Sequence, residues 1–228
     1  RHQLRVAATV PEARGVVSIY LTGRDLDQLP VAAGQFFHIR FLRGGGWWRP
    51  HPFSISAAPN GEYLRMTIKD LGDDSHRMMS MPEGTPVFIE GPYGAFTPEV
   101  VSRDHVVMLA GGVGVTPLRS IFEALPLGER HITFLYREGD PKDTIFREEL
   151  MALATRHGAV LRFLEGHRGS AKMPIDPLAP EWLYRHAPHI VVADVLVCGS
   201  RSFTERVLSS LKTLRVPDDQ VHAERFGY

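Results

Sequence analysis

The feature that most restricts the fold of this chain is an apolar run that leads into a glycine-rich turn. Val106–Leu109 is followed at once by Ala110-Gly111-Gly112-Val113-Gly114-Val115-Thr116-Pro117, and an amphipathic helix is predicted from Pro117 to Leu125. Such a turn between a strand and a helix brings backbone N–H groups to a phosphate at the helix N-terminus, where the helix dipole favours anions. The spacing differs from Gly-x-Gly-x-x-Gly, so a tight turn without a ligand stays open as an alternative.

Strands and helices alternate after about residue 100. Further strands are expected at Ile132–Tyr136, Val160–Leu164, Val195–Cys198 and Gln220–Phe226, and helices at Thr144–His157 and Ser202–Leu214. Ser202 and Glu205 fit the capping box that starts a helix. Alternation of this kind indicates a Rossmann-like α/β domain with a parallel sheet.

The first hundred residues show a different pattern, with short strand candidates separated by Gly, Pro and Asn. They lie at Leu4–Val10, Gly15–Leu21, Phe36–Leu42, Phe53–Ala57, Tyr63–Lys69 and Pro86–Glu90, with a first turn at Pro11–Arg14 and one short helix within Gly72–Met81. This pattern is typical of an antiparallel β-barrel or sandwich. We therefore expect a barrel domain at residues 1–100 and an α/β domain at residues 101–228, with the boundary near Pro98–Asp104.

Composition places the chain among ordinary globular proteins. Of its 228 residues 43% are hydrophobic and 23% are charged, with zero formal net charge, which indicates neither disorder nor a basic field for nucleic acid. The single cysteine, Cys198, excludes an internal disulfide and fits a reducing, cytoplasmic compartment. The 11 histidines lack metal-binding spacing, and no apolar stretch is long enough to cross a bilayer. A start at Arg1 rather than Met leaves open a longer protein with a membrane segment upstream.

A second short turn, Cys198-Gly199-Ser200, follows the strand at Val195–Cys198. In an open α/β sheet this turn would lie beside the first one at the carboxyl edge, where ligands bind. Small residues there leave room for a flat ring. Cys198 has no recognisable His-Asp or Cys-x-x-Cys partner, which favours a packing role over that of a nucleophile.

Tyr136-Arg137 stands at the end of the second strand of this half, where no clear acidic residue is recognised. An arginine at this place is suited to a 2′-phosphate and favours NADPH, with NADH as the alternative. A solvated loop charge is an equal interpretation of Arg137.

The segment His51-Pro52-Phe53-Ser54 resembles the flavin motif of the ferredoxin–NADP reductase superfamily, in which a flavin-binding barrel precedes a pyridine-nucleotide domain. The superfamily's Arg-x-Tyr-Ser/Thr aligns with these four residues, so that both the arginine and the tyrosine are replaced. Arg49 lies two residues upstream, out of register, and is not counted as that arginine. The His-Pro-Phe-Ser/Thr version is seen in the ferric reductase and NADPH oxidase branch, whose dehydrogenase domains hang from haem-bearing membrane helices.

Four further segments resemble the same branch, in the expected order. They are Ile68–Ser75, similar to Ile-Arg-x-x-Gly-Asp-Trp-Thr; Glu90–Gly94, at the end of the barrel; Cys198–Ser200, similar to Cys-Gly-Pro; and His222–Phe226, the last strand. In the first of these, Lys69 replaces the arginine, Asp74 the aromatic residue and Ser75 the threonine.

The resemblance implies which residues hold the cofactors. For FAD they are His51, Pro52, Phe53, Ser54, Ile68, Lys69, Gly72 and Ser75, and for NADPH or NADH they are Gly111, Gly112, Gly114, Thr116, Pro117, Arg137, Cys198 and Gly199. Lys69 and the N–H groups around Gly72–Ser75 are expected to hold the pyrophosphate. Asp73 and Asp74 fit a phosphate site poorly and are expected to face solvent or to occupy helix N-terminal positions.

The same resemblance implies three residues at the reacting atoms, Ser54, Cys198 and Phe226. Ser54 is expected within reach of flavin N5. Phe226 is expected to cover the flavin face until the nicotinamide displaces it, with Tyr228 as a second candidate for this lid.

The implied function is an oxidoreductase that passes a hydride from NAD(P)H to FAD N5. Single electrons would then reach an acceptor such as haem, ferric iron, an iron–sulfur protein or oxygen. The branch further implies the cytosolic dehydrogenase part of a ferric-reductase-like membrane protein. A freestanding soluble ferredoxin or flavodoxin reductase and a non-catalytic flavin-binding redox sensor stay open as alternatives.

Overall fold

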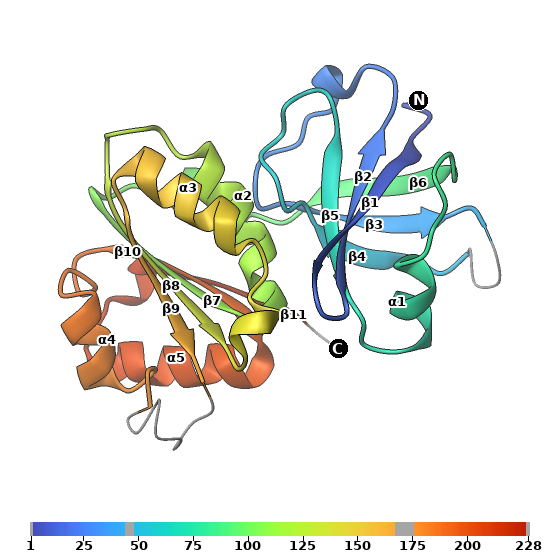
Figure 1. Ribbon diagram of the computed structural model, residues 1–228. Helices are drawn as coiled ribbons and strands as arrows, with labels where there is room; N and C mark the ends of the chain where they lie inside the picture. The colour runs from blue at the N-terminus through green and yellow to red at the C-terminus, as the bar shows by residue number, and fades with distance from the viewer. Residues whose placement is uncertain (1, 44–47, 167–175, 227–228) are drawn as a thin grey trace.

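The first half of the chain forms two three-stranded antiparallel sheets (Figure 1). The computed structural model describes residues 2–43, 48–166 and 176–226, without the side chain of Phe226. The strand orders are β1-β2-β5 and β4-β3-β6, formed by β1 (Arg5–Ala13), β2 (Val16–Thr22), β3 (Phe36–Phe41), β4 (His51–Ser54), β5 (Leu64–Lys69) and β6 (Val87–Tyr93). Isolated bridges between Arg5 and Pro86 and between Ile55 and Met66 join one sheet to the other. One apolar core fills the space between them, and the predicted antiparallel barrel is confirmed.

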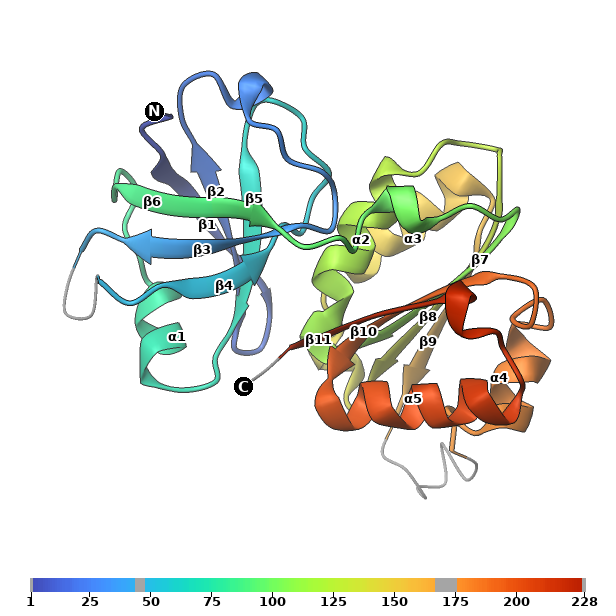
Figure 2. The same ribbon diagram turned by 180° about the vertical axis from the view of Figure 1, so that it is seen from behind.

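The second half is a five-stranded parallel sheet in the order β11-β10-β7-β8-β9. Its strands are β7 (His105–Gly111), β8 (His131–Glu138), β9 (Val160–Glu165), β10 (Asp194–Ser200) and β11 (Val221–Phe226), and its helices are α2 (Val115–Ala124), α3 (Arg147–His157), α4 (Pro180–His186) and α5 (Arg201–Thr213). Helices α2 and α3 cover one face of the sheet, and α4 and α5 cover the other (Figures 1 and 2). The strand order reverses between β7 and β10, the place where open α/β sheets bind ligands. The predicted Rossmann-like domain is confirmed.

Shorter elements complete the two halves. Helix α1 (Asp73–Met78) packs beside β5. Short 3₁₀ helices lie at Leu26–Gln28, Pro98–Val100, Gly112–Gly114, Pro141–Asp143 and Asp218–Gln220.

Several helix starts differ from the sequence prediction. Helix α5 begins at Arg201, and the hydroxyl of Ser200 caps it by accepting the Phe203 N–H at 3.3 Å. The predicted capping box starting at Ser202 is wrong, because Ser202 already lies in the first turn. Helix α3 begins at Arg147 instead of Thr144, after Phe146 in the left-handed conformation at φ 59°.

Two shorter features were also placed differently by the sequence. Strand β1 continues through Pro11 to Ala13, so the first hairpin turns at Arg14 and Gly15, and Gly15 has a left-handed φ of 67°. Helix α4 was not predicted, because its seven residues give too short a pattern to recognise.

The connection between the two halves runs from β6 to β7. The N–H groups of Ser102 and Arg103 donate to the buried Asp194 carboxylate of β10 at 2.6 and 2.8 Å, which fastens the connection to the parallel sheet. We propose the domain boundary near residue 100, within this connection. No helix among the described residues has the length and apolar character to cross a bilayer.

Candidate functional site

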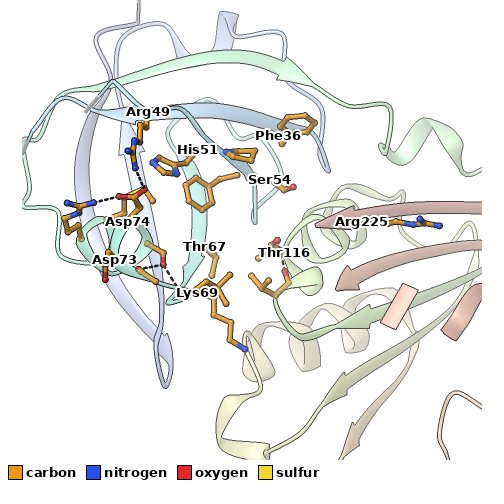
Figure 3. Close-up of a pocket in the computed structure, with 18 of the residues that line it drawn as sticks. Phe36, Arg49, His51, Ser54, Thr67, Lys69, Asp73, Asp74, Thr116 and Arg225 are labelled. Carbon is orange, nitrogen blue, oxygen red and sulfur yellow. Dashed lines mark hydrogen bonds and ion pairs between the residues drawn. The ribbon is translucent and has the colours of Figure 1, made fainter. Parts of the chain in front are cut away.

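A cavity of about 670 Å³ lies where β4, β5 and α1 of the barrel face the turn after β7 (Figure 3). This volume falls within the range of about 300–1,000 Å³ that is common for small-molecule and cofactor sites. Of the residues proposed from sequence, those that line the cavity are His51, Pro52, Phe53, Ser54, Lys69, Gly72, Ser75 and Thr116. Lining residues that the sequence did not propose are Phe36, Arg49, Thr67, Leu71, Asp73, Asp74, Arg77, Met78, Val113, Glu224 and Arg225.

Strand β4 presents its whole length to the cavity, and Ser54 is its last residue. Ser54 is only 4% exposed, and its hydroxyl oxygen has no hydrogen-bond partner within the described residues. A buried hydroxyl without a partner is costly. The site therefore offers a polar group that a bound molecule could satisfy.

Strand β5 alternates between the cavity and the core. Thr67 and Lys69 line the cavity, whereas Ile68 between them is 1% exposed and belongs to the barrel core. The period of two along a strand would have identified Thr67 from sequence. The structure places the side chain of Ile68 away from the cavity.

Charged groups gather at the end of the cavity near β4 and α1. Arg49 lies 3.4 Å from the Asp74 carboxylate, and Arg77 pairs with the same carboxylate (Figure 3). The hydrogen bond from Arg77, together with the charges of both arginines, lowers the pKa of Asp74. Asp74 therefore faces two cations at the cavity wall. Arg49, which was set aside because of its register, also lines the cavity next to His51.

The surroundings of His51 favour its neutral form. Burial lowers the pKa of His51, and the charges of Arg49 and Arg77 lower it further against the opposing effect of Asp74. His51 thus does not replace the superfamily's arginine as a charge. The positive charge at this end of the cavity comes from Arg49 and Arg77.

Helix α1 begins in a turn that requires glycine. Gly72 at its N-cap has φ 144° and ψ −174°, a combination that only glycine adopts readily. The Ser75 hydroxyl accepts the Leu71 N–H and donates to the Gly72 carbonyl, both at 2.8 Å. Both Gly72 and Ser75 face the cavity, with the serine hydroxyl engaged in the turn.

The turn after β7 packs directly on the end of β10. This strand continues through Cys198 and Gly199 to Ser200, so the prediction of a turn at these residues is wrong. A Cβ atom added to Gly114 would overlap the Cys198 carbonyl and lie 2.6 Å from the Gly199 Cα. Gly112 has a left-handed φ of 54°. Packing and backbone conformation therefore explain much of the glycine pattern. This agrees with the alternative interpretation, a tight turn that binds no ligand. Of this turn, Val113 and Thr116 line the cavity.

Cys198 is fully buried in the core under α2. Burial raises the pKa of its thiol, and the charge of Glu224 raises it further. Because the thiolate is the reactive form, these surroundings favour the packing role. Gly111 ends β7, Gly199 lies in β10 and Pro117 lies in the first turn of α2, and none of the three lines the cavity.

Glu224 of β11 is a cavity residue to which the sequence assigned no role. It pairs in register with Cys198 of β10, and its Oε2 has no hydrogen-bond partner in the described part of the chain. Burial raises its pKa to about 7. The signal that could have found it is its place in the segment His222–Phe226, two residues before the residue that the sequence proposed as the lid.

Phe226 ends β11 opposite Ser200 of β10. Its side chain and the whole of Tyr228, the second lid candidate, lie outside the described residues.

Arg137 has a structural role at the end of β8. Its guanidinium donates to the carbonyls of Leu164 at 2.7 Å and Gly166 at 2.5 Å, and also to that of Glu138. Strand β8 continues to Glu138, which pairs in register with Glu165 of β9. The prediction that no acidic residue stands at the end of this strand is therefore wrong, because β8 is longer than predicted and ends at Glu138.

Two family models match the chain. One, for an FAD-binding domain, matches residues 8–97, and the other, for an oxidoreductase NAD-binding domain, matches residues 108–208. Together they cover most of the sequence, in the order of the two halves described above.

Known proteins of similar sequence and structure agree with this division. A flavohemoprotein of Burkholderia sp. (strain TH2) is 31% identical over 97% of this chain and 58% of its own length. The ferredoxin reductase component of 3-ketosteroid-9-alpha-monooxygenase from Mycobacterium tuberculosis is 30% identical over 98% of this chain and 65% of its own length. The chain thus spans about three fifths of such relatives.

A solved structure matches over the full length of both chains. It is the flavohem-like FAD/NAD-binding domain of nitric oxide dioxygenase from Vibrio cholerae, with a TM-score of 0.76 and 25% identity, covering 100% of each chain. The chain belongs to the ferredoxin–NADP reductase superfamily, as an FAD-binding barrel followed by an oxidoreductase NAD-binding domain.

Proposed function

We propose that this chain is the reductase part of an electron-transfer protein, with FAD on the barrel side of the cavity and NAD(P)H on the side of the turn after β7 and the end of β10. The observation that carries the proposal is a cavity lined by both halves, with a buried polar atom on each that has no hydrogen-bond partner among the described residues: Ser54 Oγ and Glu224 Oε2. Bound FAD would supply the chemistry: a hydride from NAD(P)H would be taken up at N5 and electrons would pass singly to an acceptor.

The barrel side would hold the flavin. Phe53 supplies an apolar wall, and the free hydroxyl of Ser54 supplies a hydrogen bond that orients and polarises the ring. No general base is needed for hydride transfer. The pyrophosphate would lie against Lys69 and the α1 turn, with Arg49 and Arg77 adding positive charge.

The parallel-sheet side would hold the nucleotide. Helix α2 is ten residues long and begins at the turn after β7, so its N-terminus favours the dinucleotide phosphates. The expected contacts are Gly111, Gly112, Gly114, Thr116, Pro117, Cys198 and Gly199, mainly through backbone atoms, with Phe226 as the lid. Arg137 would reach a 2′-phosphate only by exchanging its bonds to the Leu164 and Gly166 carbonyls. Glu224, whose pKa burial raises to about 7, would donate or accept a hydrogen bond beside the nicotinamide.

The acceptor and the cellular setting are proposed from the relatives and the motif. The names flavohemoprotein and ferredoxin reductase point to haem or an iron–sulfur protein as the class of acceptor. The His51–Ser54 motif favours the ferric-reductase-like and NADPH-oxidase-like branch, with ferric iron or oxygen as further acceptors and a position at the cytoplasmic face of a membrane. A freestanding reductase and a flavin-binding sensor are the alternatives.

An anaerobic titration tests the proposal. The protein is loaded with FAD, separated from free flavin and mixed with NADH or NADPH while the absorbance near 450 nm, about where oxidised flavin absorbs, is followed. Rapid bleaching by one or both nucleotides is expected, and the ratio of the two rates gives the nucleotide preference. FAD retention without bleaching would instead favour the sensor, and failure to bind FAD would overturn the proposal.

A further inference from the structure

Helix α2 carries a continuous polar face that starts in the cavity and ends in the interface with the barrel. Thr116 lines the cavity, and Arg119, Ser120 and Glu123 follow at the third, fourth and seventh positions after it. This spacing places all four residues on one side of the helix. Helix α2 lies on the side of the second half that faces the barrel (Figure 2), so the helix that begins at the nucleotide turn also brings its polar face to the barrel.

This face holds the backbone segment that directly follows the flavin motif. The bonds are Arg119 Nη1 to the Ser56 carbonyl at 3.2 Å, Ser120 Oγ to the Ala57 carbonyl at 3.0 Å, and the Ala58 N–H to Glu123 Oε2 at 2.6 Å. Ser56 is only two residues beyond Ser54. The two motifs that define the site are therefore tied together through a few bonds.

Ion pairs between two buried arginines and partly exposed glutamates extend the connection to β5 and α3. Glu149 of α3 accepts both guanidinium nitrogens of Arg65, at 2.7 and 3.0 Å, and lies 2.7 Å from Arg119 Nη2. The Arg65 and Arg119 side chains are 4% and 8% exposed, and Arg119 also pairs with Glu123. The Arg65 guanidinium stacks 4.5 Å from the ring of Phe146, the left-handed residue before α3.

We propose that Arg65, Arg119, Glu123 and Glu149 form an interdomain clamp that positions the hydride donor against the acceptor. These are positioning residues, because none of the four lines the cavity. The inference rests on the proposed function. It adds that transfer depends on charged groups at the interface, beyond the flavin and nucleotide motifs themselves.

The physical argument concerns geometry more than stability. Buried ion pairs often add little net stability compared with apolar replacements. They can nevertheless favour one relative position of the two elements that carry the charges. Hydride transfer needs donor and acceptor within roughly 3–3.5 Å, and a displacement of about 1 Å can cost 100-fold in rate. A clamp that fixes β5, α2 and the segment after β4 together controls that distance.

The first experiment compares Arg119→Met with Arg119→Lys and with Arg206→Met as a matched control. Arg206 makes a two-nitrogen ion pair with Asp176, entirely within the second half. We expect Arg119→Met to lower the rate constant of flavin reduction at saturating nucleotide by about 10- to 100-fold, Arg119→Lys to restore part of it, and Arg206→Met to leave it unchanged. FAD affinity should change less than about threefold in all variants. An unchanged rate in Arg119→Met overturns the proposal.

A second readout does not depend on turnover. Spin labels are attached at Glu62→Cys in the barrel and Lys212→Cys in α5, both exposed positions. The native cysteine is buried and does not compete. We expect a narrow distance distribution in the parent protein and a broadened or shifted one with Arg119→Met or the milder Ser120→Ala. Unaltered distributions in both variants overturn the clamp. If the parent fails to reduce flavin, the proposed function fails while these distances still decide whether the clamp fixes the two halves.

Discussion

The barrel wall of the cavity presents side chains, whereas the wall from the parallel sheet presents mostly packed backbone. On the barrel side, charged, hydroxyl and aromatic groups from β4, β5 and α1 face the cavity. On the other side, glycine lets the turn after β7 touch the end of β10, and among the described residues of this half Val113, Thr116, Glu224 and Arg225 reach the cavity. A substitution on the barrel wall should therefore keep the fold and alter the chemistry of the cavity. A substitution at the packed backbone of the other wall should disrupt the fold first.

The largest expected effect is a loss of stability when the packed backbone wall is disrupted. Gly114→Ala places a methyl group against the Cys198 carbonyl, and we expect a loss of about 3 kcal/mol in the free energy of unfolding. Gly112→Ala is the matched control, because its obstacle is only the left-handed φ of 54°, worth about 1 kcal/mol. Chemical denaturation measures both, and equal losses would contradict the packing argument.

The next effect tests the side-chain wall through Ser54. Ser54→Ala removes a hydroxyl that has no partner among the described residues, so stability should hold while flavin reduction slows by about 10- to 100-fold. Ser210→Ala is the opposite case, since its hydroxyl donates to the Leu178 carbonyl at 2.6 Å far from the cavity. That control should lose stability and keep its rate. A reduction rate unaffected by Ser54→Ala would remove its role at N5.

Glu224 sharpens the comparison, because it is a titratable side chain on the backbone wall. Burial raises its folded pKa to about 7, so between the unfolded pKa and pH 7 the folded state binds more protons than the unfolded state. Its contribution to stability therefore falls as pH rises through this window. We expect Glu224→Gln to be more stable than the parent by about 1–2 kcal/mol at pH 8 and nearly equal at pH 4.

Unfolding at the two pH values measures this difference. Glu205→Gln is the control, because the hydrogen bond and charge of Arg201 lower the pKa of Glu205. Its contribution should not fall between pH 5 and 8. A pH-independent gain in Glu224→Gln would show that burial does not perturb this carboxyl.

The smallest effect concerns Arg49 at the charged end of the barrel wall. Its side chain is largely exposed, and exposed charge pairs contribute little, so Arg49→Ala should weaken FAD binding by only about three- to fivefold. Arg201→Ala removes a comparable exposed ion pair away from the cavity and should leave FAD affinity alone. Flavin fluorescence titration measures the FAD affinity of both variants. An affinity of Arg49→Ala equal to that of the parent protein would show that Arg49 does not contribute to FAD binding.

Sequence reasoning predicted the architecture because its signals are local. Alternating strands and helices, and punctuated short strands, identified both halves. Helix starts were less certain, since a single capping hydroxyl at Ser200 or a left-handed residue at Phe146 moves a boundary by two or three residues.

The site was only partly predictable, because its geometry depends on which way each side chain points. The motif containing Ile68 was read as a unit, although alternation along β5 sends that side chain to the core. Arg49 was excluded by alignment register, which says nothing about how close it lies to His51. Glu224 lies inside the last-strand segment His222–Phe226 but received no role, and the pairing of β11 with β10 brings it to the cavity.

Because Cys198 is completely buried, the chain's one thiol can report on local opening of the fold. A maleimide or disulfide reagent added to the native protein finds no accessible thiol. Modification of Cys198 therefore requires β10 to separate from its neighbours. The speed of that modification consequently reports how often the sheet opens, with no engineered probe and no cofactor present.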